Sequence, residues 1–200
     1  MRFSSYIVKH DTGLAPNPSW GYCTLGLCTP NHQGVKLQKG DWIMGNTPSD
    51  RGNKIVFVMQ ISEVLNFNDY YNDPRFQAKK PKLNGTWRER CGDNMYYKDD
   101  EGNWKKHPSS FHCDNGTRKK DLNHPYVFIV EHFFYFGDQA VQIPNEFKEL
   151  IRRRQGCKCN HNPETVEKFL NWLQHSFNPG IHGKPHDRVL VEQDDCGRHC

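Results

Sequence analysis

Residues 54–64 read KIVFVMQISEV, the clearest β-strand pattern in the chain. Successive side chains of a strand point to opposite faces. One face would carry Ile55, Phe57, Met59 and Ile61, and the other would carry Val56, Val58, Gln60 and Ser62. Because both faces are at least partly apolar, we expect this strand to be covered on both sides, as in a closed barrel or a covered sheet.

Three further apolar stretches predict neighbouring strands, at 2–9, 42–45 and 125–136. Residues 47–53 are polar and rich in turn formers, so they predict a hairpin tip. Residues 66–125 are predicted to form a polar, irregular middle segment, because charged residues, asparagine and glycine interrupt every apolar pattern there.

A long loop is predicted for residues 10–30. Glycine and proline punctuate it at Gly13, Pro16, Pro18, Gly21, Gly26 and Pro30. Loops of this length inside a compact domain are usually functional. Asn17 lies between two of the prolines, and ordering such a loop is expensive without a purpose, so we favour a functional role for it.

Two helices are predicted after the strands, at 145–154 and 162–177. The second has Asn162 as its N-cap and Pro163 at its first position, and Pro179-Gly180 ends it. Strands that lead and helices that follow predict an α+β fold, built on a small barrel or a strongly bent sheet.

Composition excludes several classes of protein. Of the 200 residues, 35% are hydrophobic and 12% aromatic. No apolar run approaches the roughly 18 residues that a membrane span requires, and no internal repeat is visible. The N-terminal MRFSSYIVKHDTG lacks the apolar core of a signal peptide, so we expect a cytoplasmic protein. In that compartment the eight cysteines would be reduced thiols or metal ligands.

Five segments carry a resemblance to a known family. They read APNP at 15–18, GYCTL at 21–25, KGDWI at 39–43, CGDNMY at 91–96 and HFFYFG at 132–137. Together they resemble the second of the nucleotide modification associated domain families, over about residues 2–188. The resemblance implies a phage or bacterial setting of DNA base modification.

A looser resemblance is to the PUA-like domains of the EVE, YTH and ASCH branch. It is carried by Lys39-Gly40-Asp41 before an apolar strand, by the long strand that ends at Glu63-Val64, and by the DYY and DPRF segments at 69–71 and 73–76. Such domains bind modified bases or structured RNA. The resemblance implies a Gly-Asp turn at the mouth of a small barrel, with a base pocket near the N-terminal loop.

The residue types needed to read a flipped base are all present. Aromatic faces stack on the base, amides or carboxylates read its edge, and cations hold the flanking phosphates. The candidates for base or nucleotide binding are Asn17, Trp20, Tyr22, Asp41, Trp42, Asp93, Asn94 and Tyr96. The candidates for phosphate binding are Lys79, Lys80, Arg88, Arg90, Lys105, Arg118 and Lys119. The alternative is that the aromatic residues fill an aliphatic-poor core and the basic residues form a solvated face.

An enzymatic alternative rests on Asp93, His112 and Cys23. A carboxylate, an imidazole and a thiol can support hydrolysis or group transfer. Their spacing matches no standard motif: the sequence has no P-loop, no Rossmann glycine pattern, no GxSxG and no HExxH. A small buried thiol is the plainer interpretation of Cys23.

Two cysteine clusters suggest a metal. Cys157 and Cys159 precede His161, and Cys196 and Cys200 flank His199, so one tetrahedral zinc could join the two segments. Exposed thiols on a tail are the alternative. The proposed base recognition itself requires no cofactor.

The sequence therefore predicts one α+β, PUA-like domain over 1–188, with an insertion at about 66–124 and a Cys/His tail at 189–200. The predicted function is that of a binding module for a modified or flipped nucleobase or a nucleotide. The expected partner is a nucleic acid, DNA in preference to RNA, or a nucleotide, with a modification enzyme as a further partner and no membrane. The alternative is a hydrolase or transferase acting on a nucleotide or modified base.

Overall fold

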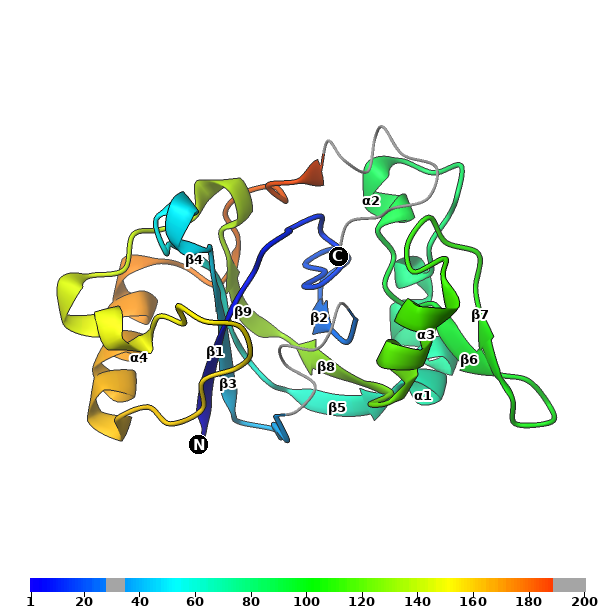
Figure 1. The fold of residues 1–200 in the computed structure, drawn as a ribbon, viewed down its shortest axis with the longest axis horizontal. Coiled ribbons are helices and arrows are strands. Elements are labelled where there is room, and N and C mark those ends of the chain that lie inside the picture. Colours follow the sequence, from blue (N-terminus) through cyan, green and yellow to red (C-terminus); the bar gives the residue numbers. More distant parts are fainter. Residues whose placement is uncertain (28–34, 189–200) are drawn as a thin grey trace. The chain divides into compact units, whose positions relative to one another are not determined.

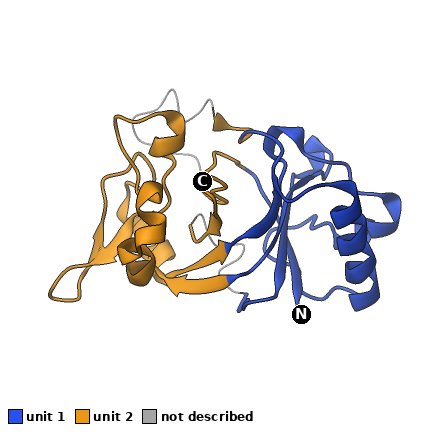
Figure 2. Ribbon diagram, turned by 180° about the vertical axis from the view of Figure 1, so that it is seen from behind, with its two compact units in different colours: residues 1–9, 30–62, 130–184 blue, residues 10–29, 63–129, 185–200 orange. Residues whose placement is uncertain are grey.

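The computed structural model describes residues 1–27 and 35–188. The chain divides into two compact units (Figure 2). Unit 1 comprises Met1–Lys9, Pro30–Ser62 and Val130–Lys184. Unit 2 comprises His10–Thr29, Glu63–Ile129 and Pro185–Cys200. The predicted insertion at 66–124 falls inside unit 2, where it packs with the predicted N-terminal loop.

Unit 1 is built on a five-stranded mixed sheet (Figure 1). Its strand order is β1 (Phe3–Ile7), β3 (Trp42–Asn46), β4 (Ile55–Gln60), β9 (His132–Tyr135) and β10 (Gly180–Ile181). The central pairs β3–β4 and β4–β9 are antiparallel, whereas the outer pairs β1–β3 and β9–β10 are parallel. Residues 47–53, predicted as a hairpin tip, connect β3 to β4 through the 3-10 helix η1 (Ser49–Arg51).

The core of unit 1 lies between this sheet and α4 (Pro163–Ser176), with η4 (Asn145–Leu150) and η3 (Gly137–Gln139) alongside. The apolar stripe of α4 is Val166, Phe169, Leu170 and Leu173, and all four are buried. The Asn162 side chain accepts hydrogen bonds from the backbone N–H groups of Glu164 and Thr165, so the predicted N-cap is confirmed. The prediction for 145–154 was wrong, because this segment is a 3-10 helix that ends at Leu150. The Arg152 side chain instead donates to the carbonyls of Gln155 and Gly156.

Unit 2 contains a three-stranded sheet in the order β2 (Cys23–Leu25), β8 (Tyr126–Val130) and β5 (Glu63–Asn66). A separate hairpin pairs β6 (Tyr96–Lys98) with β7 (Trp104–Lys106). Its helices are α1 (Phe67–Asn72), η2 (Pro74–Lys79), α2 (Trp87–Arg90) and α3 (Asn115–Leu122).

The middle segment is thus regular, contrary to the prediction of an irregular chain. Side-chain caps define its short helices: Asn66 caps α1, Thr86 and Glu89 form a capping box on α2, and Asp114 caps α3. An aromatic cluster that includes Phe67, Tyr70, Phe76, Tyr96 and Phe111 supplies the core. Side-chain caps and scattered aromatic residues lack the long apolar periodicity by which a helix is recognised in a sequence.

Two predicted long strands are each broken in two. Residues 54–64 form β4 and β5, and residues 125–136 form β8 and β9. At the break, the Ser62 hydroxyl accepts a hydrogen bond from the Glu131 backbone N–H at 3.0 Å. The small barrel was also wrong for the part of the chain that the structure describes: its strands form three separate sheets, and the five-stranded one has two open ends. The fold class is α+β. Within the described ranges, no helix combines the length and the apolar character needed to cross a membrane.

Candidate functional site

The predicted N-terminal loop contains a short hairpin within unit 2. Asn17 and Thr24 exchange two backbone hydrogen bonds, of 2.8 and 2.9 Å, and so close a turn over residues 18–23. At its tip, Trp20 has φ of +62° and Gly21 has φ of +84°. Glycine adopts this left-handed conformation easily, whereas a bulky tryptophan is strained in it. Residues held in this way cluster at functional sites, which makes the partly exposed Trp20 notable.

Lys79 lies beneath this hairpin and is only 1% exposed. Its ammonium donates to Asn17 Oδ1 at 3.0 Å and to the Asn17 carbonyl at 3.1 Å. It also lies 5.7 Å from the centre of the Trp20 ring. Burial lowers the pKa of Lys79 from 10.5 to about 8, against the opposing attraction of Asp93 and Cys23. The phosphate contact predicted for Lys79 is therefore corrected: its ammonium supports the hairpin from inside.

Asp93 is the second buried charge of this region. Its carboxylate accepts hydrogen bonds from the Thr24 hydroxyl at 2.5 Å and from the Tyr70 hydroxyl at 2.8 Å. Burial raises the pKa of Asp93, whereas Lys79 and these two hydroxyls lower it. We call Asn17, Thr24, Tyr70, Lys79 and Asp93 the hairpin network.

Asn94 extends the hairpin network. Its amide N–H group donates to the carbonyls of Tyr70 and Phe76, at 3.0 and 3.1 Å. Its buried Oδ1 atom accepts no hydrogen bond from any described residue. A buried acceptor without a donor is uncommon and points to a water or a ligand atom that completes it.

The structure therefore brings together several predicted residues: Asn17, Trp20, Asp93 and Asn94, with the revised Lys79. Tyr22 lies next to them in the hairpin and packs edge-on against Phe76. Thr24 and Tyr70 were not among the predicted site residues, although they lie in the GYCTL segment at 21–25 and the DYY segment at 69–71. Their hydroxyl groups, which can donate a hydrogen bond to a carboxylate, were the available signal.

Three other residues predicted to bind a base, Asp41, Trp42 and Tyr96, are buried inside the protein. Asp41 and Trp42 belong to unit 1, where Asp41 accepts from the backbone N–H groups of Arg2 and Gln38, and Trp42 is buried in the core. Tyr96 is buried and stacks on Phe67, so its ring has no face open to a base.

The catalytic candidates have different hydrogen-bond partners, although Asp93 lies near enough to Cys23 to raise the pKa of its thiol. His112 Nδ1 pairs with the Asp121 carboxylate, which also accepts from the Tyr96 hydroxyl at 2.8 Å. Asp93 pairs instead with Thr24 and Tyr70. Burial raises the pKa of Cys23 to about 12, so this thiol stays protonated near pH 7 and is a poor nucleophile.

The basic candidates other than Lys79 lie nearer the surface of unit 2. Lys80 lies over the Tyr71 ring at 3.6 Å, and Arg88 lies over the Trp87 ring at 5.6 Å. Lys105 pairs with Asp99, and Arg118 donates to the Trp104 carbonyl. Arg90 is half-buried at the end of α2, and Lys119 is exposed on α3.

The metal prediction concerns two cysteine pairs, of which only the first is described. Cys157 and Cys159 are free thiols, and Ser4 donates to the Cys159 sulfur at 3.6 Å. Cys196 and Cys200 lie outside the described residues. Within the described ranges, no group of three or more histidine, cysteine or carboxylate side chains is arranged to hold a metal ion. Cys113 corrects the expectation of reduced thiols, because it is disulfide-bonded.

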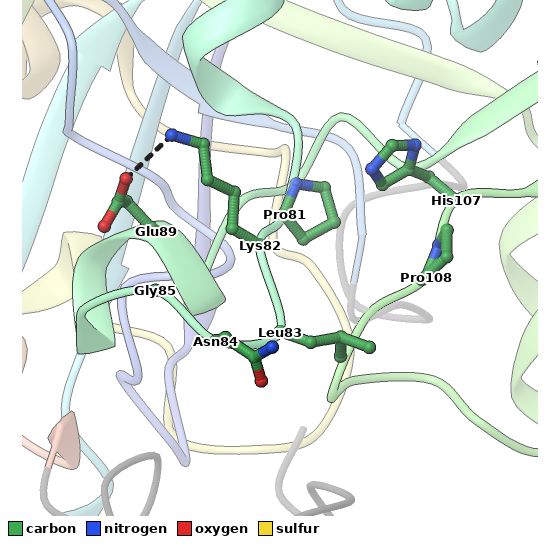
Figure 3. Close-up of a pocket in the computed structure, with 8 residues that line it drawn as sticks. All are labelled: Pro81, Lys82, Leu83, Asn84, Gly85, Glu89, His107 and Pro108. Atoms are coloured by element: carbon green, nitrogen blue, oxygen red, sulfur yellow. Dashed lines mark hydrogen bonds and ion pairs between the residues drawn. The ribbon is translucent and has the colours of Figure 1, made fainter.

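A separate cavity of about 560 Å³ lies in unit 2 (Figure 3). We call it the 81–108 pocket, lined by Pro81, Lys82, Leu83, Asn84, Gly85, Glu89, His107 and Pro108. None of these residues was predicted to bind a base. Isolated proline, leucine and asparagine residues in a polar segment give no pattern that would have singled them out.

The family follows from a comparison with known families. The model of nucleotide modification associated domain 2 matches residues 1–192, so the chain belongs to this family. No curated protein and no solved structure matches the chain. The family places the chain in the context of nucleotide or base modification.

Proposed function

We propose that this protein is a binding module that recognises a nucleobase, modified or flipped out of its strand, or a nucleotide. The binding surface is the hairpin tip of residues 18–22, with Trp20 as the stacking face. The observation that carries this proposal is the Lys79 ammonium, which is buried in the hairpin network and lies 5.7 Å from the ring centre of the strained Trp20.

Lys79 and Asp93 are buried charged groups, and burying a charge is unfavourable. A lysine ammonium and a carboxylate inside a protein lose their hydration, and apolar residues of similar size often stabilise a fold as well or better. Strongly shifted pKa values that arise from burial plus a charged neighbour are typical of functional sites. In this chain both shifted groups, Lys79 and Asp93, bond to the two residues that close the hairpin.

The chemistry of the tip suits a base. An aromatic ring stacks on any base with an energy of about 1–3 kcal/mol. The Lys79 ammonium near the ring of Trp20 adds a positive field to that face, which favours an electron-rich partner. Basic side chains elsewhere on unit 2, including Arg88 and Lys119, would add the salt-dependent attraction of a phosphate backbone.

The proposed biological setting is DNA modification. A phage or bacterial DNA-modification or defence system, DNA in preference to RNA, and an associated modification enzyme are all consistent with the family. We also propose a relation to the PUA-like domains and a zinc ion bound by Cys157, Cys159, Cys196 and Cys200.

The enzymatic alternative now rests on His112. The Asp121 carboxylate, which also accepts from the Tyr96 hydroxyl, orients its imidazole, as a general base requires. Under this alternative a nucleotide or modified base would be converted to a product visible by mass spectrometry. His112→Gln would abolish the product while oligonucleotide binding stays intact.

Fluorescence anisotropy tests the binding proposal. The probes are short DNA and RNA strands with and without 5-methyl- and 5-hydroxymethyl-pyrimidines, at low and high salt. We expect Trp20→Ala to weaken binding about tenfold or more. The matched control is Tyr126→Ala, which removes another exposed aromatic residue of unit 2 and should leave binding unchanged. Equal effects of the two variants, or binding that vanishes at high salt and ignores modification, would overturn the proposal.

A further inference from the structure

The 81–108 pocket shares no lining residue with the hairpin network and contains none of the predicted site residues. Its volume of about 560 Å³ lies within the range of roughly 300–1,000 Å³ that small-molecule sites occupy. Its walls come from the connection between η2 and α2, from α2 itself, and from the segment after β7.

The wall at 82–89 is rigid. The Lys82 backbone N–H donates to the Glu89 carbonyl at 3.0 Å, and Gly85 N–H donates to the Lys82 carbonyl at 3.1 Å. The Glu89 carboxylate also accepts from the backbone and side chain of Thr86, both at 3.0 Å. A Cβ atom at Gly85 would lie 2.7 Å from the Glu89 Cβ, so only glycine fits there without a shift. Such a wall is ordered before a ligand arrives, which favours binding.

The charges of the pocket cancel. Lys82 Nζ donates to Glu89 Oε1 at 2.8 Å, and Figure 3 shows this pair at one side of the pocket. Burial and the neighbouring Lys80 lower the pKa of His107, so its imidazole is neutral at pH 7. The side chains that line the pocket carry no net charge, so the lining itself does not select a phosphate.

His107 offers a ring face. Its Nδ1 lies 3.0 Å from the Tyr71 hydroxyl, and the ring also hydrogen-bonds to the backbone of Pro81, which can only accept. These bonds fix the orientation of the ring. Leu83, which is 49% exposed, extends toward Pro108 in Figure 3, and together they give the pocket an apolar side.

Asn84 supplies the polar specificity. Its amide forms no hydrogen bond with any residue that the structure describes, so both its donor and its acceptor are available. An asparagine amide recognises a base edge that carries an adjacent donor and acceptor, and adenine is its usual partner.

We propose that the 81–108 pocket binds an uncharged nucleoside, with adenosine as the preferred ligand. The base would lie against His107 and Leu83, and the Asn84 amide would read its edge. This second site does not need the hairpin tip to bind, so it stands or falls separately from the proposed function.

Isothermal titration of the full chain with adenosine, adenosine monophosphate and inorganic phosphate tests this proposal. We expect saturable binding of adenosine that changes little with salt, no gain from the added phosphate group, and no binding of phosphate alone. Asn84→Ala should weaken adenosine binding about tenfold or more. Leu83→Ala should weaken it several-fold, and the exposed Asn171→Ala of α4 is the matched control.

Three results would overturn the proposal. Adenosine could fail to bind at millimolar concentration, phosphate could bind where adenosine does not, or Asn84→Ala could behave like Asn171→Ala. Trp20→Ala separates the two sites, because it should weaken oligonucleotide binding about tenfold or more and leave adenosine binding intact. Adenosine binding without any oligonucleotide binding would remove the proposed function and retain this inference.

Discussion

Replacing the buried lysine by an apolar residue of similar length tests whether the hairpin network exists for binding or for stability. In Lys79→Met the two acceptors of Asn17 keep other donors: the backbone N–H of Thr24 bonds the carbonyl, and that of Ser19 bonds Oδ1. The substitution therefore leaves no acceptor of Asn17 without a donor. Lys79→Met also removes the positive charge that faces the buried Asp93 carboxylate, and this loss opposes the gain from burying an apolar side chain. We expect Lys79→Met to fold and to lose base binding.

The magnitude follows from the pKa of Lys79, which burial lowers from 10.5 to about 8. This shift corresponds to about 3 kcal/mol by which the folded state disfavours the charged form. Between pH 8 and 10.5 the unfolded chain retains a proton on Lys79 that the folded chain has lost. Unfolding then takes up a proton, so the folded wild-type protein gains stability as the pH rises.

Urea denaturation of both proteins from pH 7 to 10.5 measures the effect. Cys23 and Tyr70, whose pKa values burial raises, reduce stability at the upper end of this range, but they do so in both proteins. The change of this difference with pH reports mainly the titration of Lys79. We expect the wild-type protein to gain about 2–3 kcal/mol of stability relative to Lys79→Met between pH 7 and 10.5. A difference between the two proteins that stays constant over this pH range would refute the reasoning.

Three more predictions concern packing, capping and thiol chemistry. Phe169→Ala should lower the free energy of unfolding by about 3–5 kcal/mol, since the side chain is fully buried against the sheet. Lys168→Ala on the exposed face should leave it nearly unchanged, and equal effects of the two variants in urea would contradict the described core. Thr86→Ala should cost about 1 kcal/mol in the same assay, because it removes the capping box of α2, and an unchanged midpoint would be inconsistent with that box. Cys23 should react with iodoacetamide far more slowly at pH 8 than the exposed Cys159, as peptide mass spectrometry would show, and equal rates would contradict its buried, protonated state.

Much of unit 1 could be predicted from the sequence. Its strands have apolar alternation, and α4 has a cap, a proline at its first position and a regular apolar stripe. Sequence patterns do not predict where a strand ends when contacts between distant segments decide it. The two long strands break where the Glu131 backbone N–H donates to the Ser62 hydroxyl, and nothing in either strand's own pattern marks this contact.

The elements of unit 2 are harder to predict from the sequence than those of unit 1. Its short helices are fixed by caps and by packing of scattered aromatic residues, so their periodicity is too short to detect. The candidate site was predicted in part, because Asn17, Asp93 and Asn94 were chosen from motifs. The role of Lys79 could not be predicted, since a lysine in a polar segment is normally solvated and only the fold reveals its burial.

The most direct test of the central claim is to find where a base contacts the chain. An oligonucleotide with a photoreactive 5-iodo-pyrimidine would be crosslinked to the protein, and the product would be digested with trypsin and mapped by mass spectrometry. Cleavage after Lys9 and Lys36 isolates the hairpin in one peptide, and cleavage after Lys82 and Arg88 isolates the sequence LNGTWR of the 81–108 pocket. We predict that the crosslink lies in the 10–36 peptide, at Trp20 or Tyr22. A crosslink confined to the lysine-rich segments at 98–120, with none in the 10–36 peptide, would contradict the account.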